Sequence, residues 1–222
     1  MMQGKLISLE GLDGVGKTTC AKLLSQMLTT DENVFKYVNR KTVPVINEYI
    51  QLHMQHLYDI LWGKGKVFSQ APDIAYNGLN PDHWRHLMIA WYSAFEQLVI
   101  LPMLKQGKCV ITDGYIYKEI AKAIYSRPDL KTEQEFDFLY KPDMTFYLVA
   151  SPEECVRSSS LNNRVESGKF VGLSGDFISH QTKMKFIYDE LAKQHHWIPI
   201  LRSNKPINTC YPIIEIIRNN LH

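Results

Sequence analysis

The chain has 222 residues, of which 45% are hydrophobic, and this is enough for one domain with a sizeable core. Its formal net charge of +2 is too small to argue for binding to nucleic acid or to a membrane surface. The four cysteines show no C-x-x-C pair and no metal-ligand spacing, which favours reduced thiols in a cytoplasmic protein. We expect no signal peptide and no membrane span, because no apolar run approaches roughly 20 residues.

The first apolar segment leads directly into a glycine-rich loop. Residues 5–10 predict a buried strand, residues 11–18 match the pattern G-x-x-x-x-G-K-[ST], and residues 18–28 predict a helix. Strand, loop and helix in this order form a phosphate-binding P-loop, whose backbone N–H groups and lysine face the phosphates of a nucleotide. The sequence therefore predicts binding of ATP and Mg²⁺. The predicted nucleotide-binding residues are Gly11, Asp13, Gly14, Gly16, Lys17, Thr18 and Thr19.

The rest of the chain alternates apolar strands with helical segments, which is typical of a parallel sheet covered on both faces. Asp82 is the predicted N-cap of the longest apolar helix. We expect a single α/β domain over residues 1–222, a three-layer P-loop fold with a parallel sheet of about five strands. Further strands are predicted at 34–38, 109–112, 144–149 and 197–201, and helices at 45–61, 82–99, 115–126, 132–140, 152–162, 176–194 and 207–220.

An acidic residue, Asp113, directly follows the apolar strand at 109–112. A carboxylate in this position of a P-loop protein is usually part of a Mg²⁺ site. We therefore predict that Thr18 and Asp113 form the metal site, and that Lys17 and Asp113 act in catalysis.

These segments resemble the thymidylate kinase family of nucleotide kinases. Residues 10–19 look like the family's version of the P-loop, residues 113–115 stand where it carries Asp-Arg-Tyr, and residues 141–154 are similar to its fourth strand and the helix after it. The resemblance implies an ATP-dependent kinase with a lid at about 161–175. It also implies that Arg164, in that lid, is the catalytic cation that stabilises charge on the transferred phosphoryl group.

The acceptor side departs from the family pattern. Gly114 replaces the arginine of Asp-Arg-Tyr, and Tyr92 stands where a second phosphate-binding arginine is expected. Arg40 lies close to where the arginine of the family's Arg-Glu-Pro-Gly-Gly segment would fall. Either other cations, namely Arg40, Arg85 or Lys118, bind the acceptor phosphate, or the acceptor has no phosphate there. The predicted substrate-binding residues are Asp13, for a sugar hydroxyl, with Arg40, Tyr92 and Tyr115.

Several functions therefore stay open at the level of sequence. The acceptor is a nucleotide or nucleoside-like molecule similar to dTMP, or it is a hydroxyl group of another metabolite with Asp113 as the base. A nucleotide-binding module without catalysis is disfavoured, because Lys17, Thr18 and Asp113 are all present. The resemblance implies a homodimer through long helices, although the apolar stripe on residues 87–99 fits a monomer core equally well.

Overall fold

The computed structural model describes residues 4–62, 80–128, 132–158 and 177–220. At its centre lies a sheet of five parallel strands in the order β2-β3-β1-β4-β5. The predicted α/β fold with a parallel sheet of about five strands is confirmed. The strands are β1 (Leu6–Glu10), β2 (Phe35–Val38), β3 (Cys109–Thr112), β4 (Met144–Val149) and β5 (Ile198–Leu201).

The central strands are apolar because both of their faces are covered. Every residue of β1 and of β3 is buried, as expected for the interior strands of a parallel sheet. β1 occupies the middle position, with Ile7 opposite Ile111 of β3 and opposite Met144 of β4. The carboxyl ends of β1, β2 and β3 consequently meet at one edge of the sheet.

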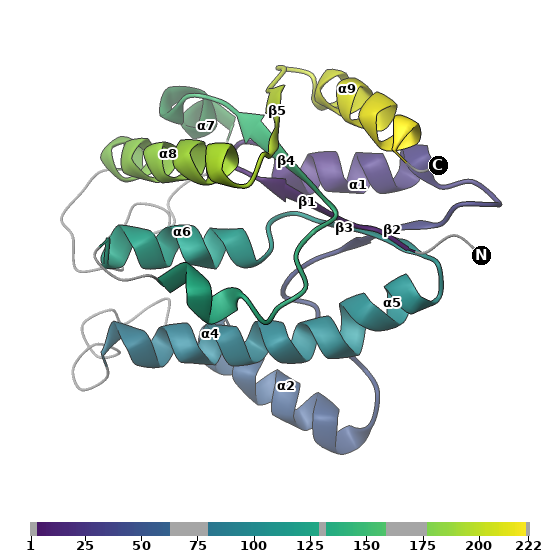
Figure 1. Ribbon diagram of the computed structural model, residues 1–222, viewed down its shortest axis with the longest axis vertical. Coiled ribbons are helices and arrows are strands. Elements are labelled where there is room, and N and C mark those ends of the chain that lie inside the picture. The colour runs from purple at the N-terminus through teal and green to yellow at the C-terminus, as the bar shows by residue number, and fades with distance from the viewer. Residues whose placement is uncertain (1–3, 63–79, 129–131, 159–176, 221–222) are drawn as a thin grey trace.

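Helices form a layer on each side of the sheet (Figure 1). α1 (Lys17–Leu28) and α9 (Pro206–Asn219) lie on one side and contact each other, with the sulfur atoms of Cys20 and Cys210 3.1 Å apart. On the other side lie α4 (Pro81–Phe95) and α6 (Ile116–Ser126), and α2 (Glu48–Leu61) packs on α4 away from the sheet. The other helices are α5 (Leu101–Lys105), α7 (Pro152–Ser158) and α8 (Phe177–Gln194), with the π-helical turn η1 (Glu96–Ile100) and the 3₁₀ turn η2 (Thr132–Phe136).

The prediction that Asp82 caps the long helix was wrong. The cap is Asn80, whose side-chain oxygen accepts a hydrogen bond from the backbone N–H of His83 at 3.0 Å. Pro81 occupies the first helical position, where its fixed φ suits a helix and no N–H is needed, so the helix begins one residue earlier. Asp82 instead pairs with Arg85 at 2.5 Å and with Arg127 at 2.8 Å.

The long helix also bears on the expected absence of a membrane span. The run Asp82–Lys105 is long and apolar enough to cross a membrane, judged by length and composition alone. Its side chains Trp91, Tyr92 and Phe95 are nevertheless fully buried within the protein. A core helix meets the same criteria, and the position of α4 beneath the sheet accounts for this composition.

Two further predictions differ from the structure or lie beyond it. The helix predicted at 132–140 is only the short turn η2. The backbone bonds of this segment run from residue i+3 to residue i, as from the Leu139 N–H to the Phe136 carbonyl oxygen at 3.1 Å, which is the 3₁₀ pattern. The predicted lid at 161–175, with Arg164, lies outside the described residues.

Candidate functional site

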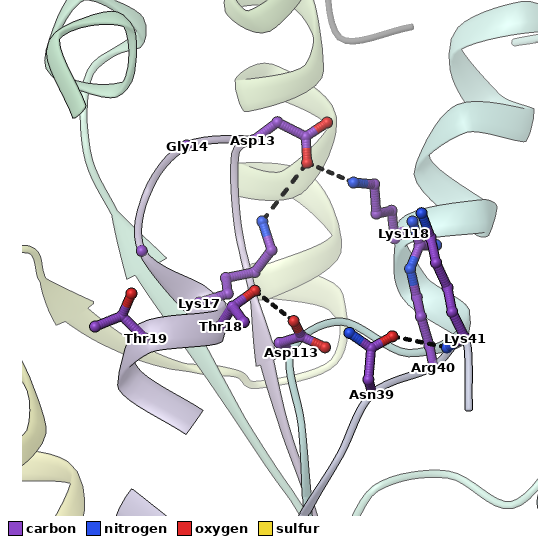
Figure 2. Close-up of a pocket in the computed structure, with 11 residues that line it drawn as sticks. Asp13, Gly14, Lys17, Thr18, Thr19, Asn39, Arg40, Lys41, Asp113 and Lys118 are labelled. Atoms are coloured by element: carbon purple, nitrogen blue, oxygen red, sulfur yellow. Dashed lines mark hydrogen bonds and ion pairs between the residues drawn. The ribbon is translucent and has the colours of Figure 1, made fainter. Parts of the chain in front are cut away.

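A cavity of about 300 Å³ opens at the carboxyl ends of the central strands. Its walls come from the P-loop between β1 and α1, the loop after β2, and the segment from β3 into α6 (Figure 2). Open α/β sheets bind their ligands in this crevice. The residues around it are Asp13, Gly14, Gly16, Lys17, Thr18, Thr19, Asn39, Arg40, Lys41, Asp113 and Lys118.

The P-loop has the backbone geometry that its glycines permit. Gly11 has φ 138° and Gly16 has φ 105°, which are values that side chains with a Cβ rarely adopt. A Cβ atom on Gly11 would also lie 2.7 Å from the carbonyl oxygen of Leu148. Because α1 begins at Lys17, its free N–H groups and positive dipole end face the cavity.

The side chain of Lys17 is held against the P-loop by backbone carbonyl groups of that loop. Its Nζ donates hydrogen bonds of 2.7 Å to the carbonyl oxygens of Gly11 and Leu12, and lies 3.9 Å from a carboxylate oxygen of Asp13. Burial lowers the pKa of Lys17, and the negative charge of Asp13 opposes that shift. An arriving phosphate would compete with these carbonyl groups for the ammonium group.

The predicted metal residues, Thr18 and Asp113, are in direct contact. The Thr18 hydroxyl donates to Oδ2 of Asp113, and the Tyr37 hydroxyl donates to the same oxygen at 3.0 Å. The other oxygen, Oδ1, is buried and has no hydrogen-bond partner in the described part of the chain. A free carboxylate oxygen beside a threonine hydroxyl and a phosphate loop fits Mg²⁺, which binds few protein oxygens and keeps water and phosphate as its other ligands.

Asp13 forms an ion pair with Lys118 at the start of α6 (Figure 2). Burial would raise the pKa of Asp13, but the positive charges of Lys118 and Lys17 outweigh it and hold that pKa well below its usual range. The backbone N–H of Asp13 donates to the side chain of Gln181 on α8 at 3.2 Å. Asp13 is therefore ionised and fixed in place at the cavity wall.

Arg40 reaches the cavity from the loop after β2. Its Nη1 donates to Oε1 of Glu119 at 2.5 Å and to the hydroxyl of Tyr92 at 3.3 Å. Although burial disfavours the charged form of Glu119, Lys122 and Arg40 lower its pKa to about 2. The Arg40 carbonyl oxygen accepts a hydrogen bond from Nε1 of Trp91 at 2.9 Å, so main chain and side chain are both anchored.

Two predicted substrate residues lie behind the cavity wall. Tyr92 and Tyr115 are fully buried and their rings meet edge to face, with centroids 5.5 Å apart. Tyr92 reaches the cavity only through Arg40, while the Tyr115 hydroxyl donates to Oε2 of Glu96 at 3.2 Å. Arg85 does not line the cavity and forms an ion pair with Glu135 at 2.8 Å. The expectation that Arg85 is one of the cations that bind the acceptor phosphate was therefore wrong.

Gly114 adopts a backbone conformation that suits glycine, and Glu10 supports the loop that follows Asp113. Gly114 has φ 104°, so any other residue there would be strained. Glu10 is fully buried, and its Oε1 accepts from the Ser8 hydroxyl at 2.6 Å and from the Tyr115 N–H at 2.9 Å. Burial raises the pKa of Glu10. Its hydrogen bond to the backbone after Gly114 makes it a support for the Asp113 loop.

Sequence reasoning missed three residues of the site, Tyr37, Asn39 and Lys41. Asn39 links the other two, because its side chain donates to the Tyr37 hydroxyl at 3.2 Å and accepts from the backbone N–H of Lys41 at 2.8 Å. The signal was available: all three lie at or just after the carboxyl end of β2, the strand beside β3. The argument that singled out Asp113 applies equally there.

The chain is similar to thymidylate kinases over most of its length. A family model described as thymidylate kinase matches residues 77–211. The chain is 25% identical to "Probable thymidylate kinase 2" of Saccharolobus solfataricus over 93% of this chain and 91% of that protein. It is 27% identical to a thymidylate kinase of Clostridium novyi over 97% of this chain and 98% of that protein. The second alignment covers 97% of this chain and therefore includes the P-loop, which precedes the segment matched by the family model.

Proposed function

Because this chain belongs to the thymidylate kinase family, we propose that it transfers the γ-phosphate of ATP to a nucleoside monophosphate, with dTMP as the first candidate. The chain is an ATP-dependent nucleotide kinase. The choice of acceptor is the proposal, since the thymidylate kinases compared above are at most 27% identical to it. A cytoplasmic location, where ATP and nucleotides meet, is part of the proposal.

The observation that carries the proposal is the cavity with cations on two opposite sides. Lys17 and the N-terminus of α1 supply positive charge on the donor side, and Arg40 and Lys118 supply it on the other (Figure 2). A reaction between two anionic substrates needs this arrangement, because each phosphate must be neutralised while the two approach.

The roles proposed for the donor side follow from the contacts around Lys17. The P-loop N–H groups and Lys17 bind the ATP phosphates and orient the γ-phosphate toward the acceptor. Thr18 and Asp113 would hold Mg²⁺, which neutralises charge on the phosphate oxygens when it is bound. Arg164 and the lid at 161–175 are assigned from the family resemblance alone.

A hydroxyl acceptor is the second candidate, and one observation favours it. The buried Oδ1 of Asp113 has no hydrogen-bond partner in the described residues, so it could take a proton from a hydroxyl group. A monophosphate acceptor is already an anion and needs no such base. The hydrogen bonds from Thr18 and Tyr37 to the other oxygen support the metal role as well.

We also propose that the active form is a homodimer assembled through α2. Val45, Ile46, Tyr49 and Leu52 are exposed on this helix and the segment before it, and Tyr49 is 84% exposed. An apolar stripe of this kind marks an interaction surface. A second copy of the chain is the proposed occupant, because thymidylate kinases are often dimeric.

The experiment is an assay of ADP release from Mg-ATP with nucleoside monophosphates, the matching nucleosides and other hydroxyl compounds. We expect turnover with dTMP or a related monophosphate, and loss of that turnover in Lys17→Ala with an unchanged circular dichroism spectrum. Turnover with hydroxyl compounds alone would favour the second candidate. ADP release in none of the mixtures would contradict both and favour a module without catalysis.

A further inference from the structure

The cations near the acceptor side are not equally available to a ligand. Lys118 is paired with Asp13, and Arg40 is paired with Glu119 at 2.5 Å. Lys122 also contacts Glu119, at 3.2 Å. Lys41, in contrast, makes no ion pair with any carboxylate of residues 4–62, 80–128, 132–158 and 177–220. Within the described part of the chain, this cation at the cavity wall therefore has no carboxylate partner.

The loop after β2 fixes the direction of Lys41. Its backbone N–H donates to the side chain of Asn39 at 2.8 Å, and the Thr42 hydroxyl donates to the Asn39 carbonyl oxygen at 2.7 Å. The ammonium group lies 5.6 Å from the ring centre of Trp62, over which Arg40 also sits at 5.9 Å. The aromatic face stabilises both cations and holds them side by side.

Four cations lie close together here, and the described residues pair them with only two carboxylates, Asp13 and Glu119, so a further anion bound among them would be stabilised. Lys41 lies near Arg40 on its own loop and near Lys118 and Lys122 on α6, and the negative charge of Glu119 partly offsets these positive charges. Lys41 is exposed as a residue, but desolvation of its ammonium group, followed by the positive charges of Arg40, Lys118 and Lys122, lowers its pKa to about 8. Figure 2 shows Arg40, Lys41 and Lys118 together on the side of the cavity opposite Thr19.

We propose that Lys41 binds the anionic group of the acceptor and thereby selects monophosphates over neutral nucleosides. This inference rests on the proposed function. The anion would lie between Lys41 and Lys118, close to Arg40, and not beside positions 92 and 114. A lysine has three donors, so Lys118 can bridge Asp13 and the anion at the same time. The cations that bind the anion thus lie just after the carboxyl end of β2 and in the first turn of α6, in place of positions 92 and 114.

The proposal accounts for both departures on the acceptor side. Tyr92 stands where a cation was expected. It carries no charge, and its hydroxyl accepts a hydrogen bond from Arg40, which holds Arg40 beside Lys41. Gly114 has a positive φ and a buried carboxylate, Glu10, behind it. Neither position is required for the anion once Lys41 and Lys118 hold it.

The test compares three variants, Lys41→Gln, Lys41→Arg and Lys36→Gln. Lys36 is an exposed lysine on β2 that does not line the cavity, so it controls for the loss of one positive charge. We would measure KM and kcat for dTMP, or for the monophosphate that turns over fastest, and the affinity of the same compound in the absence of ATP. KM for ATP is recorded in parallel.

Lys41→Gln should weaken binding of the monophosphate at least about 10-fold, because a charge-assisted contact is lost. Lys41→Arg should stay within about 3-fold of wild type, and Lys36→Gln should be unchanged. KM for ATP should be the same in all three. If wild type phosphorylates monophosphates and Lys41→Gln binds them equally well, the inference fails while the proposed function stands. If wild type phosphorylates only neutral hydroxyl compounds, both fail.

Discussion

At the residue scale, Asp113 depends on hydroxyl groups that lie far from it in the sequence. Thr18 and Tyr37 donate to one carboxylate oxygen, and the other oxygen is free in the described part of the chain. We expect Tyr37→Phe to raise the Mg²⁺ concentration needed for half-maximal activity about 3- to 10-fold, because the carboxylate loses one of two contacts that orient it. Tyr211→Phe, at an exposed position on α9, is the control. Equal Mg²⁺ dependence in both variants would contradict this role.

The charge of Lys41 leads to a second prediction at this scale. Its pKa of about 8 lies below the ordinary value of 10.5, so the group loses its proton as the pH rises through 8. The phosphate of dTMP is already a dianion there, with a second pKa of about 6. We therefore expect KM for dTMP to rise above pH 8, by up to about 10-fold per pH unit. Lys41→Arg should remove this rise between pH 7 and 9.5, because a guanidinium group keeps its proton throughout that range while the neighbouring charges of Arg40, Lys118, Lys122 and Glu119 are retained.

At the scale of elements, the π-helical turn η1 connects the long helix to the site. Buried Glu96 accepts from the Tyr115 hydroxyl at 3.2 Å and from the backbone N–H of Tyr140 at 2.5 Å. Glu96→Ala should destabilise the fold by about 2–3 kcal/mol, because a buried hydroxyl and a partly buried backbone N–H lose their partner. Glu96→Gln should cost less, since its side-chain oxygen still accepts. Urea denaturation measures both, and equal losses would argue against these hydrogen bonds.

The elements also explain how far the sequence could predict the structure. All five strands and the helix after the P-loop were predicted within one residue at each end, because buried strands of a parallel sheet are continuous apolar runs and the P-loop fixes its neighbours. The cap at Asn80 was missed because Asp82 offers the same chemistry two residues later. The order of the strands and the π turn depend on tertiary contacts, which no local pattern encodes.

The residues of the site that belong to one local motif could be predicted, whereas those that lie where several segments meet could not. Lys17, Thr18 and Asp113 could be found because the P-loop and the strand before Asp113 follow local rules. Tyr92 was expected in the acceptor site, and its actual partner, Arg40, lies 52 residues earlier in the chain. Lys41 could not be identified from the sequence, because the groups that surround it, namely Trp62, Arg40 and the lysines of α6, come from separate segments.

At the scale of the whole molecule, substitutions in the exposed apolar stripe on α2 test whether the protein is a monomer or a dimer. Tyr49 and Leu52 lie three residues apart on a helix that packs on the outer side of α4, away from the sheet (Figure 1), and they are 84% and 54% exposed. Tyr49→Glu combined with Leu52→Glu places two like charges at the centre of an isologous interface, where each copy meets the same patch of its partner. We expect the wild-type mass from light scattering to be that of two chains and the variant's mass to be that of one.

Circular dichroism separates loss of the interface from loss of the fold. Both substituted side chains are exposed on the single chain, so the monomeric variant should keep the wild-type spectrum, while its unfolding temperature falls because the stabilisation from association is lost. Lys36→Gln changes charge on β2, away from this stripe, and should stay dimeric. A wild-type protein that is monomeric at all concentrations tested would contradict the dimer. In that case the stripe would have to be covered by another partner, and the site at the sheet edge would function within a single chain.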